Sequence, residues 1–374
     1  MGISPFNHEA KILFHTDFYF YLDTLQKLQD NVSEEDLESL SEMACDDEVA
    51  LFLSRDAKSQ YNFLSLLIKS NSSWRIKELT LCILCNMMRM DFSSFKDEEM
   101  CISVPAAIIS DYSENFQQYS AENDLYYIPA LVAIFQYLTM FNDQLMQRVE
   151  DFEEESDIQF KHNFELIPNV LMLMASTLDP DLLGKSSRYL FSIVDLASLL
   201  QEPLAHIGVF LNSPQPLGLM NEALKQSLEF QDSKSSFVII ETISNVFDFL
   251  EEETVLEKEH SDQLCETLLN HLKTQEDGEL ELELSSVTSC AKICSRLWTS
   301  TCHLQSFEQI AKIYLNNQDN QADNTTDQDN EVMLDVIKKC LKHFINVHSQ
   351  TLLSDSDILQ SPILGQIVQL LVAE

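Results

Sequence analysis

The sequence predicts an all-α protein, an armadillo/HEAT-type α-solenoid whose helical repeats stack as one array over residues 1–374. Three observations predict it. Apolar residues recur at helical spacing along the chain, and no segment keeps the two-residue alternation of a half-buried strand. Only 6 Gly and 9 Pro occur in 374 residues, which leaves helix as the default between short connections. A chain of this length is long for one compact core but ordinary for a linear stack of repeats.

The most regular stretch runs from Asp46 to Asp91. It predicts a short helix near Phe63–Lys69, a polar turn at Asn71-Ser72-Ser73, and a long helix over Arg75–Met90. The long helix is apolar around most of its circumference, with one buried face formed by Ile76, Leu79, Ile83 and Met87. A narrow polar stripe remains, comprising Glu78, Cys82, Cys85, Asn86 and Arg89. Such a helix is expected to pack between neighbours and to present only the stripe to a groove.

Further helices are expected on both sides of this unit. Acidic residues after Ser33 predict a helix start, because the helix dipole favours acids in the first turn. The other expected helices, in chain order, are Ala10–Leu28, Met100–Ile109 (broken at Pro105), Ile128–Phe141, Ile167–Leu178, Leu182–Leu200, Leu204–Leu211, Leu217–Phe230, Phe237–Leu250, one around Leu264–Leu272, Val287–Trp298, Phe307–Leu315, Val332–Val347 and Ile363–Val372. Residues 316–330 are rich in Asn, Gln, Asp and Thr, and they predict a disordered acidic and polar loop.

The helix expected at Phe237–Leu250 is a second copy of the Arg75–Met90 helix. Superposing Asn245 on Asn86 also places apolar residues on apolar residues. In armadillo proteins that bind extended peptides, an inner helix carries Trp and, four residues later, an Asn that fixes the peptide backbone. The positions of that Trp are Cys82 and Glu241 here, so the aromatic half of the pattern is missing. An Asn that packs against a neighbouring turn is the competing interpretation.

Three segments resemble a known family: Asp46–Phe52, the Arg75–Met88 helix with its Ile-Leu-Cys-Asn-Met run, and Glu99–Cys101. They are similar to the serum amyloid A-like protein 1 family, which is regarded as armadillo-type. The similarity is specific over Leu37–Cys101. The resemblance implies a divergent member: a nuclear or cytoplasmic interaction protein linked to cell proliferation, with no known catalytic residues.

The charge of the chain bounds its partners. Lys and Arg number 23 against 61 Asp and Glu, a formal net charge of −38. Such a charge repels the phosphates of nucleic acids and anionic membrane surfaces, so neither is expected as a partner. Proteins with basic segments are the natural partners, and an acidic chaperone for basic proteins is an alternative function. The charge serving only solubility is the simpler interpretation.

The cysteines suggest an alternative function of another class, that of a metal- or redox-dependent enzyme. Nine cysteines in helical segments favour a reducing compartment. Cys82 and Cys85 form a C-x-x-C, but Cys82 falls in mid-helix, away from the N-terminal dipole that lowers the pKa of a redox thiol. The closest approach to a metal-ligand set is Cys290, Cys294, Cys302 and His303. Buried structural thiols are the more economical interpretation of both groups.

The sequence contains no glycine-rich phosphate loop, no H-E-x-x-H and no G-x-S-x-G. We therefore expect a non-enzymatic protein–protein interaction scaffold without cofactor or metal. Its binding groove is expected to include the two polar stripes, which comprise Glu78, Cys82, Asn86, Arg89, Glu241 and Asn245.

Overall fold

The structure is a computed structural model, and it describes residues 33–55, 63–67, 73–95, 98–114, 125–149, 157–198, 214–249, 258–276, 284–297, 304–321, 328–354, 362–363 and 365–367. Every regular element within these ranges is a helix, and none of the described residues forms a strand. The all-α prediction is thereby confirmed for this part of the chain. The chain divides into two compact units, Met1–Leu173 and Met174–Glu374. That the repeats of both units form one single array stays a prediction.

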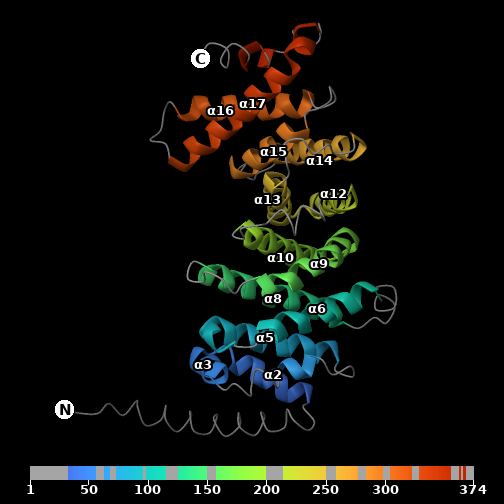
Figure 1. The fold of residues 1–374 in the computed structure, drawn as a ribbon, viewed down its shortest axis with the longest axis vertical. Coiled ribbons are helices and arrows are strands. Elements are labelled where there is room, and N and C mark those ends of the chain that lie inside the picture. The colour runs from blue at the N-terminus through green and yellow to red at the C-terminus, as the bar shows by residue number, and fades with distance from the viewer. Residues whose placement is uncertain are drawn as a thin grey trace, which may run out of the picture. The chain divides into compact units, whose positions relative to one another are not determined.

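The first unit is organised around one long helix (Figure 1). This helix, α5 (Trp74–Met90), packs against α2 (Glu34–Met43), α3 (Asp47–Arg55) and α8 (Tyr127–Val149). A 3₁₀ turn, η1 (Phe92–Ser94), follows α5 directly, and α6 (Glu98–Glu114) packs on α8. The next helix is α9 (Asp157–Ser176), whose last three residues belong to the second unit.

Local sequence explains where these helices begin. Ser33 and Ser73 are N-caps, because their hydroxyls accept hydrogen bonds from the backbone N–H of Asp36 at 3.1 Å and of Ile76 at 3.2 Å. Both starts confirm the predictions from the capping residues. The expected break at Pro105 is wrong, since α6 continues through it. Pro105 lacks the N–H that would bond the carbonyl four residues earlier, but buried apolar neighbours such as Ile102 and Ile109 hold the helix together.

The core of the first unit confirms the predicted face of α5 at Leu79, Ile83 and Met87, whereas Ile76 is only half-buried. Ile83 and Met87 are fully buried, as are Phe135 and Phe141 of α8. Phe92, in η1, meets Phe141 edge-to-face at 5.2 Å between ring centroids. A buried amide pair links α8 to α9, with Asn163 Nδ2 donating to Asn142 Oδ1 at 2.9 Å.

The second unit is built from helices that pack on their second neighbours along the chain. One row contains α10 (Pro180–Ser198), α13 (Ser233–Phe249), α15 (Leu284–Leu297) and α17 (Gln328–Ser354), each in contact with the next. The other row contains α12 (Pro214–Glu229), α14 (Lys258–Glu276) and α16 (Leu304–Gln321). Hairpin partners α12–α13, α14–α15 and α16–α17 also contact each other, and Figure 1 shows these pairs following one another.

The α12–α13 hairpin turns through Gln231, whose φ is 56°, a left-handed conformation that usually selects glycine. The Asp232 N–H bonds the Ser227 carbonyl across this turn at 3.0 Å, and the hydroxyls of Ser227 and Ser236 lie 2.8 Å apart. The hydrogen bonds of the turn therefore hold a non-glycine residue in a strained conformation.

The loop expected at 316–330 is too long at both ends. Helix α16 continues to Gln321, and α17 begins at Gln328, so polar residues such as Asn316 and Asn317 are helical. Asn317 Nδ2 donates to the Ile313 carbonyl at 2.9 Å, which keeps this polar side chain satisfied within its own helix. Residues 322–327 lie outside the described residues, as do the helices expected at Ala10–Leu28 and Leu204–Leu211.

Candidate functional site

The candidate site begins with the polar stripe of α5. Glu78, Cys82 and Asn86 are half-buried, whereas Arg89 is exposed. Cys85, the fifth residue of the expected stripe, is buried and belongs to the packed side of the helix. The stripe is thus a narrow line on a helix that is otherwise largely buried, as its sequence predicts. It runs beside α2 and α3, which contribute partners that the sequence analysis did not identify.

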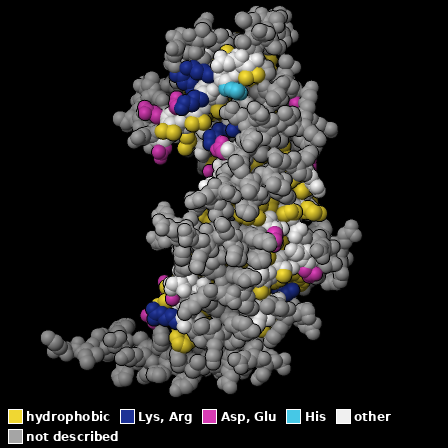
Figure 2. All heavy atoms as spheres, in the orientation of Figure 1, with side chains coloured by type: hydrophobic (Ala, Val, Ile, Leu, Met, Phe, Trp, Pro, Cys, Tyr) yellow, Lys and Arg dark blue, Asp and Glu magenta, His cyan; other side chains and the backbone are white. Residues whose placement is uncertain are grey.

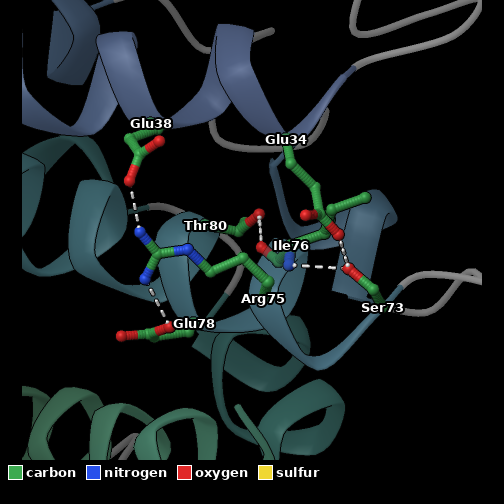
Figure 3. A network of polar contacts seen from close by, with 7 residues as sticks. All are labelled: Glu34, Glu38, Ser73, Arg75, Ile76, Glu78 and Thr80. Atoms are coloured by element: carbon green, nitrogen blue, oxygen red, sulfur yellow. Dashed lines mark hydrogen bonds and ion pairs between the residues drawn. The ribbon is translucent and has the colours of Figure 1, made fainter. Parts of the chain in front are cut away.

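At the N-terminal end of the stripe, a polar network joins α5 to α2 (Figure 3). Arg75 donates to Glu38 Oε1 at 2.6 Å and to Glu78 Oε2 at 2.8 Å. These hydrogen bonds, that to Glu78 foremost, raise the pKa of Arg75. The Ser73 hydroxyl, which caps α5, donates in turn to Glu34 Oε1 at 2.5 Å. The guanidinium also lies over the Tyr126 ring, 5.0 Å from its centroid.

The middle of the stripe faces the turn between α2 and α3. Asn86 Nδ2 lies 4.0 Å from Cys45 Sγ, a long and weak contact. Burial, and then the negative charge of Glu78, raise the pKa of the Cys82 thiol. Cys82 is therefore a poorer nucleophile than an ordinary cysteine, because the thiolate is the reactive form. Cys45, by contrast, is exposed, and its thiol donates to the Ser41 carbonyl at 3.5 Å.

At the C-terminal end of the stripe, Arg89 donates to Asp47 Oδ1 of α3 at 2.9 Å. Both side chains are largely exposed, at 50% and 67%, so the pair contributes at most about 1 kcal/mol to stability. An ion pair this exposed can exchange one partner for another at little cost. Arg75, Glu38, Cys45 and Asp47 thus extend the stripe into a strip of charged and polar groups shared by α2, α3 and α5. We call this strip the α5 polar strip.

In the second unit, the counterpart stripe lies on α13. Glu241 and Asn245 are half-buried, and Asp248, one turn further along the same face, is exposed. Asp248 accepts from Lys292 Nζ of α15 at 3.2 Å. Burial raises the pKa of the Cys340 thiol on α17, while its hydrogen bond with Ser295 and the positive charge of Lys292 act in the opposite direction. The Asp248–Lys292 pair therefore connects the α13 stripe to α15, the next helix of its row.

The two stripes occupy separate units, Glu78, Cys82, Asn86 and Arg89 in the first and Glu241 and Asn245 in the second. Each stripe is a coherent line within its own unit. The prediction that both stripes face one common groove remains a prediction.

The two candidate metal-binding cysteines that the structure describes are buried. Cys290 and Cys294 are fully buried in α15, and burial raises the pKa of the Cys290 thiol far above its ordinary range. Cys302 and His303 lie outside the described residues. Within the described part of the chain, no three His, Cys, Asp or Glu side chains come together as a metal site would require. None of the helices in the same ranges combines the length and apolar character of a membrane span.

A scan against protein-family models and a search of curated proteins find no match to this chain. The resemblance to the serum amyloid A-like protein 1 family therefore stays a prediction from the residues that carry it.

Proposed function

We propose that this protein is a non-enzymatic protein–protein interaction scaffold of the armadillo/HEAT α-solenoid type. The observation that carries the proposal is the α5 polar strip: a partly exposed line of charged groups on a helix whose other faces are buried. An outer solenoid helix would expose a much wider polar face, so the pattern favours an inner helix lining a binding groove.

The packing of the second unit supports the repeat architecture. Its helices contact the next hairpin in both rows, which is how a repeat array buries a continuous core. Stripe residues on successive helices of one row would then lie side by side, as Asp248 of α13 and Lys292 of α15 do. A row of this kind offers an extended partner segment several equivalent contacts, and the summed contact area supplies the affinity.

The chemistry of the strip favours a partner with basic segments. The strip offers three carboxylates, from Glu38, Glu78 and Asp47, against the two guanidinium groups of Arg75 and Arg89. Carboxylates accept hydrogen bonds from Lys and Arg side chains and from backbone N–H groups. The net charge of −38 adds long-range attraction for basic proteins. The resemblance noted in the sequence implies that such an interaction occurs in the nucleus or cytoplasm and is linked to cell proliferation.

Affinity capture with quantitative mass spectrometry tests the proposal. The comparison is between the wild-type protein and a variant with Glu38→Gln and Glu78→Gln, which keeps side-chain volume and removes two carboxylates of the strip. Glu222→Gln with Glu266→Gln, in α12 and α14, is the charge-matched control. If the scaffold binds partners through the strip, some proteins should be captured by the wild type and the control but not by the strip variant. Equal capture by all three would overturn the role of the strip.

The acidic charge favours a second candidate, a chaperone for basic proteins. This candidate predicts binding that falls steeply with salt and tolerates scrambled basic sequences, because screening weakens contacts between exposed charges. A scaffold with a shaped groove predicts instead that scrambling the partner segment abolishes binding at constant charge. Titration of one captured segment and its scrambled form at two salt concentrations separates the two functions. Stoichiometric zinc in the purified protein would favour a metal-dependent enzyme.

A further inference from the structure

Cys45 presents a thiol at the surface of the first unit. It is the exposed one among the described cysteines, and it lies in the short connection between α2 and α3. Its backbone N–H donates to the Glu42 carbonyl at 3.2 Å, and that of Asp46 donates to the Met43 carbonyl at 3.0 Å. Figure 2, in the orientation of Figure 1, shows charged and hydrophobic side chains together at the surface where α3 and α5 lie. The connection therefore holds Cys45 in a defined place that solvent reaches.

A second thiol, that of Cys82 in α5, lies level with Cys45. Four side-chain contacts join α5 to the segment that contains α2 and the start of α3, and their residues are 37 to 42 positions apart: Glu38–Arg75, Glu34–Ser73, Cys45–Asn86 and Asp47–Arg89. Adding these separations to 45 gives residues 82–87 as the part of α5 beside Cys45. Within that part, Cys82 and Asn86 are half-buried and the other four residues are buried.

Cys82 also lies on the side of α5 that faces Cys45. Asn86 Nδ2 is 4.0 Å from Cys45 Sγ, and Cys82 precedes Asn86 by four residues. Side chains four residues apart are neighbours on a helix surface, with Cβ atoms about 5–6 Å apart. The two thiols also interact electrostatically, because Cys45 raises the pKa of Cys82, after the larger effects of burial and of the Glu78 charge. Helix geometry and electrostatics thus place the two thiols beside each other.

We propose that hydrogen peroxide joins Cys45 and Cys82 in a disulfide that ties the α2–α3 connection to α5. The Cys45 sulfur attacks one peroxide oxygen, the O–O bond breaks, and a Cys45 sulfenic acid and one water form. The Cys82 sulfur then attacks the Cys45 sulfur, and the hydroxyl group leaves as water with the proton of the Cys82 thiol. Two thiols lose two electrons and two protons in all, and one peroxide becomes two waters. Rotation of both side chains and a shift of the α2–α3 connection bring the sulfurs together.

Exposure assigns the two cysteines different roles. Peroxide reaches exposed Cys45 first, whereas Cys82 is half-buried and holds its proton more tightly. Cys82 reacts as the resolving thiol, because its position beside Cys45 makes the second step intramolecular. Another pair of thiols, Cys294 of α15 and Cys340 of α17, also interacts across two helices. Those thiols are 0% and 9% exposed, so peroxide does not start the reaction there.

The crosslink does not depend on what the α5 polar strip binds. It lies in the middle of that strip, where Asn86 meets Cys45. On the scaffold function proposed above, and only on it, the disulfide fixes the α2–α3 connection against the binding surface and makes the capture of partner proteins sensitive to oxidation.

Mass spectrometry of the full chain after peroxide treatment tests the proposal. The folded protein is oxidised, its remaining thiols are blocked with N-ethylmaleimide, and it is digested with trypsin without reductant. Cleavage after Lys and Arg releases residues 28–55 with Cys45 and residues 78–89 with Cys82, so the disulfide joins these two peptides. Because Cys85 shares the second peptide, fragmentation must locate the bond, and Cys85→Ser is the matched control for Cys82→Ser.

We expect the joined peptides from wild type and Cys85→Ser, and their loss from Cys45→Ser and Cys82→Ser. Fragmentation of the wild-type peptides locates the bond without any variant, so the test stays decisive if a variant fails to fold. A bond from Cys45 to Cys85, a dimer linked through Cys45, or a Cys45 sulfenic acid that persists without a crosslink would each overturn the proposal and leave the scaffold function untouched. Unchanged capture of partner proteins by the crosslinked chain would overturn only the sensitivity of capture to oxidation.

Discussion

The burial of Ile83 gives the sharpest test of how the first unit is held together. Its side chain is 0% exposed and lies on the face of α5 that packs into the first unit. Replacing Ile83 with Ala removes buried carbons and leaves a cavity, at a cost of about 2–5 kcal/mol. Ile83→Asp loses the same packing and also places a carboxyl group in an apolar site. The buried carboxyl stays neutral only if its pKa rises by several units. At neutral pH, each unit of that rise lowers the stability of the folded protein by about 1.4 kcal/mol.

The combined cost for Ile83→Asp is therefore at least about 5 kcal/mol near pH 7, which matches the whole stability of many domains. Because the buried carboxyl is neutral at low pH, the variant should recover part of its stability between pH 7 and pH 5. Hydrogen exchange should show protection falling first in α2, α3 and α8, which pack on α5. Protection in α13 to α17, which belong to the second unit, should fall less.

Urea denaturation followed by circular dichroism measures the free energy of unfolding, and hydrogen exchange locates the change. Ile83→Val, expected to cost about 0.5–1.5 kcal/mol, tests whether the loss scales with the volume removed. Arg89→Ala on the same helix, expected to cost at most about 1 kcal/mol, is the exposed control. If Ile83→Ala costs no more than Arg89→Ala, the face of α5 is wrongly assigned.

Two further predictions concern the second unit. His271 is 1% exposed, its Nε2 lies 3.0 Å from Ser286 Oγ, and burial lowers its pKa to about 4. The unfolded chain binds a proton near pH 6.5 while the folded chain does not, so stability falls by roughly 3 kcal/mol as pH drops from about 6.5 to 4. The difference in unfolding free energy between wild type and His271→Gln should shrink over that window. An unchanged pH profile in His271→Gln would contradict the assignment. At the α12–α13 turn, Gln231→Gly should stabilise the protein by about 0.5–1 kcal/mol, because glycine adopts the left-handed conformation without strain. Lys234→Gly, inside α13, should destabilise by about 1 kcal/mol, and thermal melting that ranks these two variants the other way would refute the argument.

Much of the fold follows from local chemistry. Ser33 and Ser73 predict the starts of their helices because a capping hydroxyl bonds a backbone N–H within the first turn. The spacing of Ile83 and Met87 predicts the buried face of α5. The errors also have local causes. Pro105 weakens a helix, but burial of its neighbours compensates, and a polar composition after Asn316 does not prevent helix where side chains such as Asn317 bond their own backbone.

Less of the candidate site could be predicted from the sequence. Spacing places Glu78, Asn86 and Arg89 on one line, but it does not show that Glu38, Cys45 and Asp47 lie beside them from α2 and α3. No periodicity in the chain encodes these contacts, because they depend on how separate helices pack.

The central claim, that polar stripes on largely buried helices bind partner proteins, has one direct test. It is quantitative capture of proteins by the variant Asn86→Ala with Asn245→Ala, measured together with its melting temperature. Asn317→Ala with Asn346→Ala, outside the stripes, is the matched control. The account predicts weakened capture by the stripe variant, a melting temperature within about 2 °C of wild type, and normal capture by the control. Normal capture at normal stability would contradict a binding role for both asparagines, and a variant that unfolds would show that they serve packing instead.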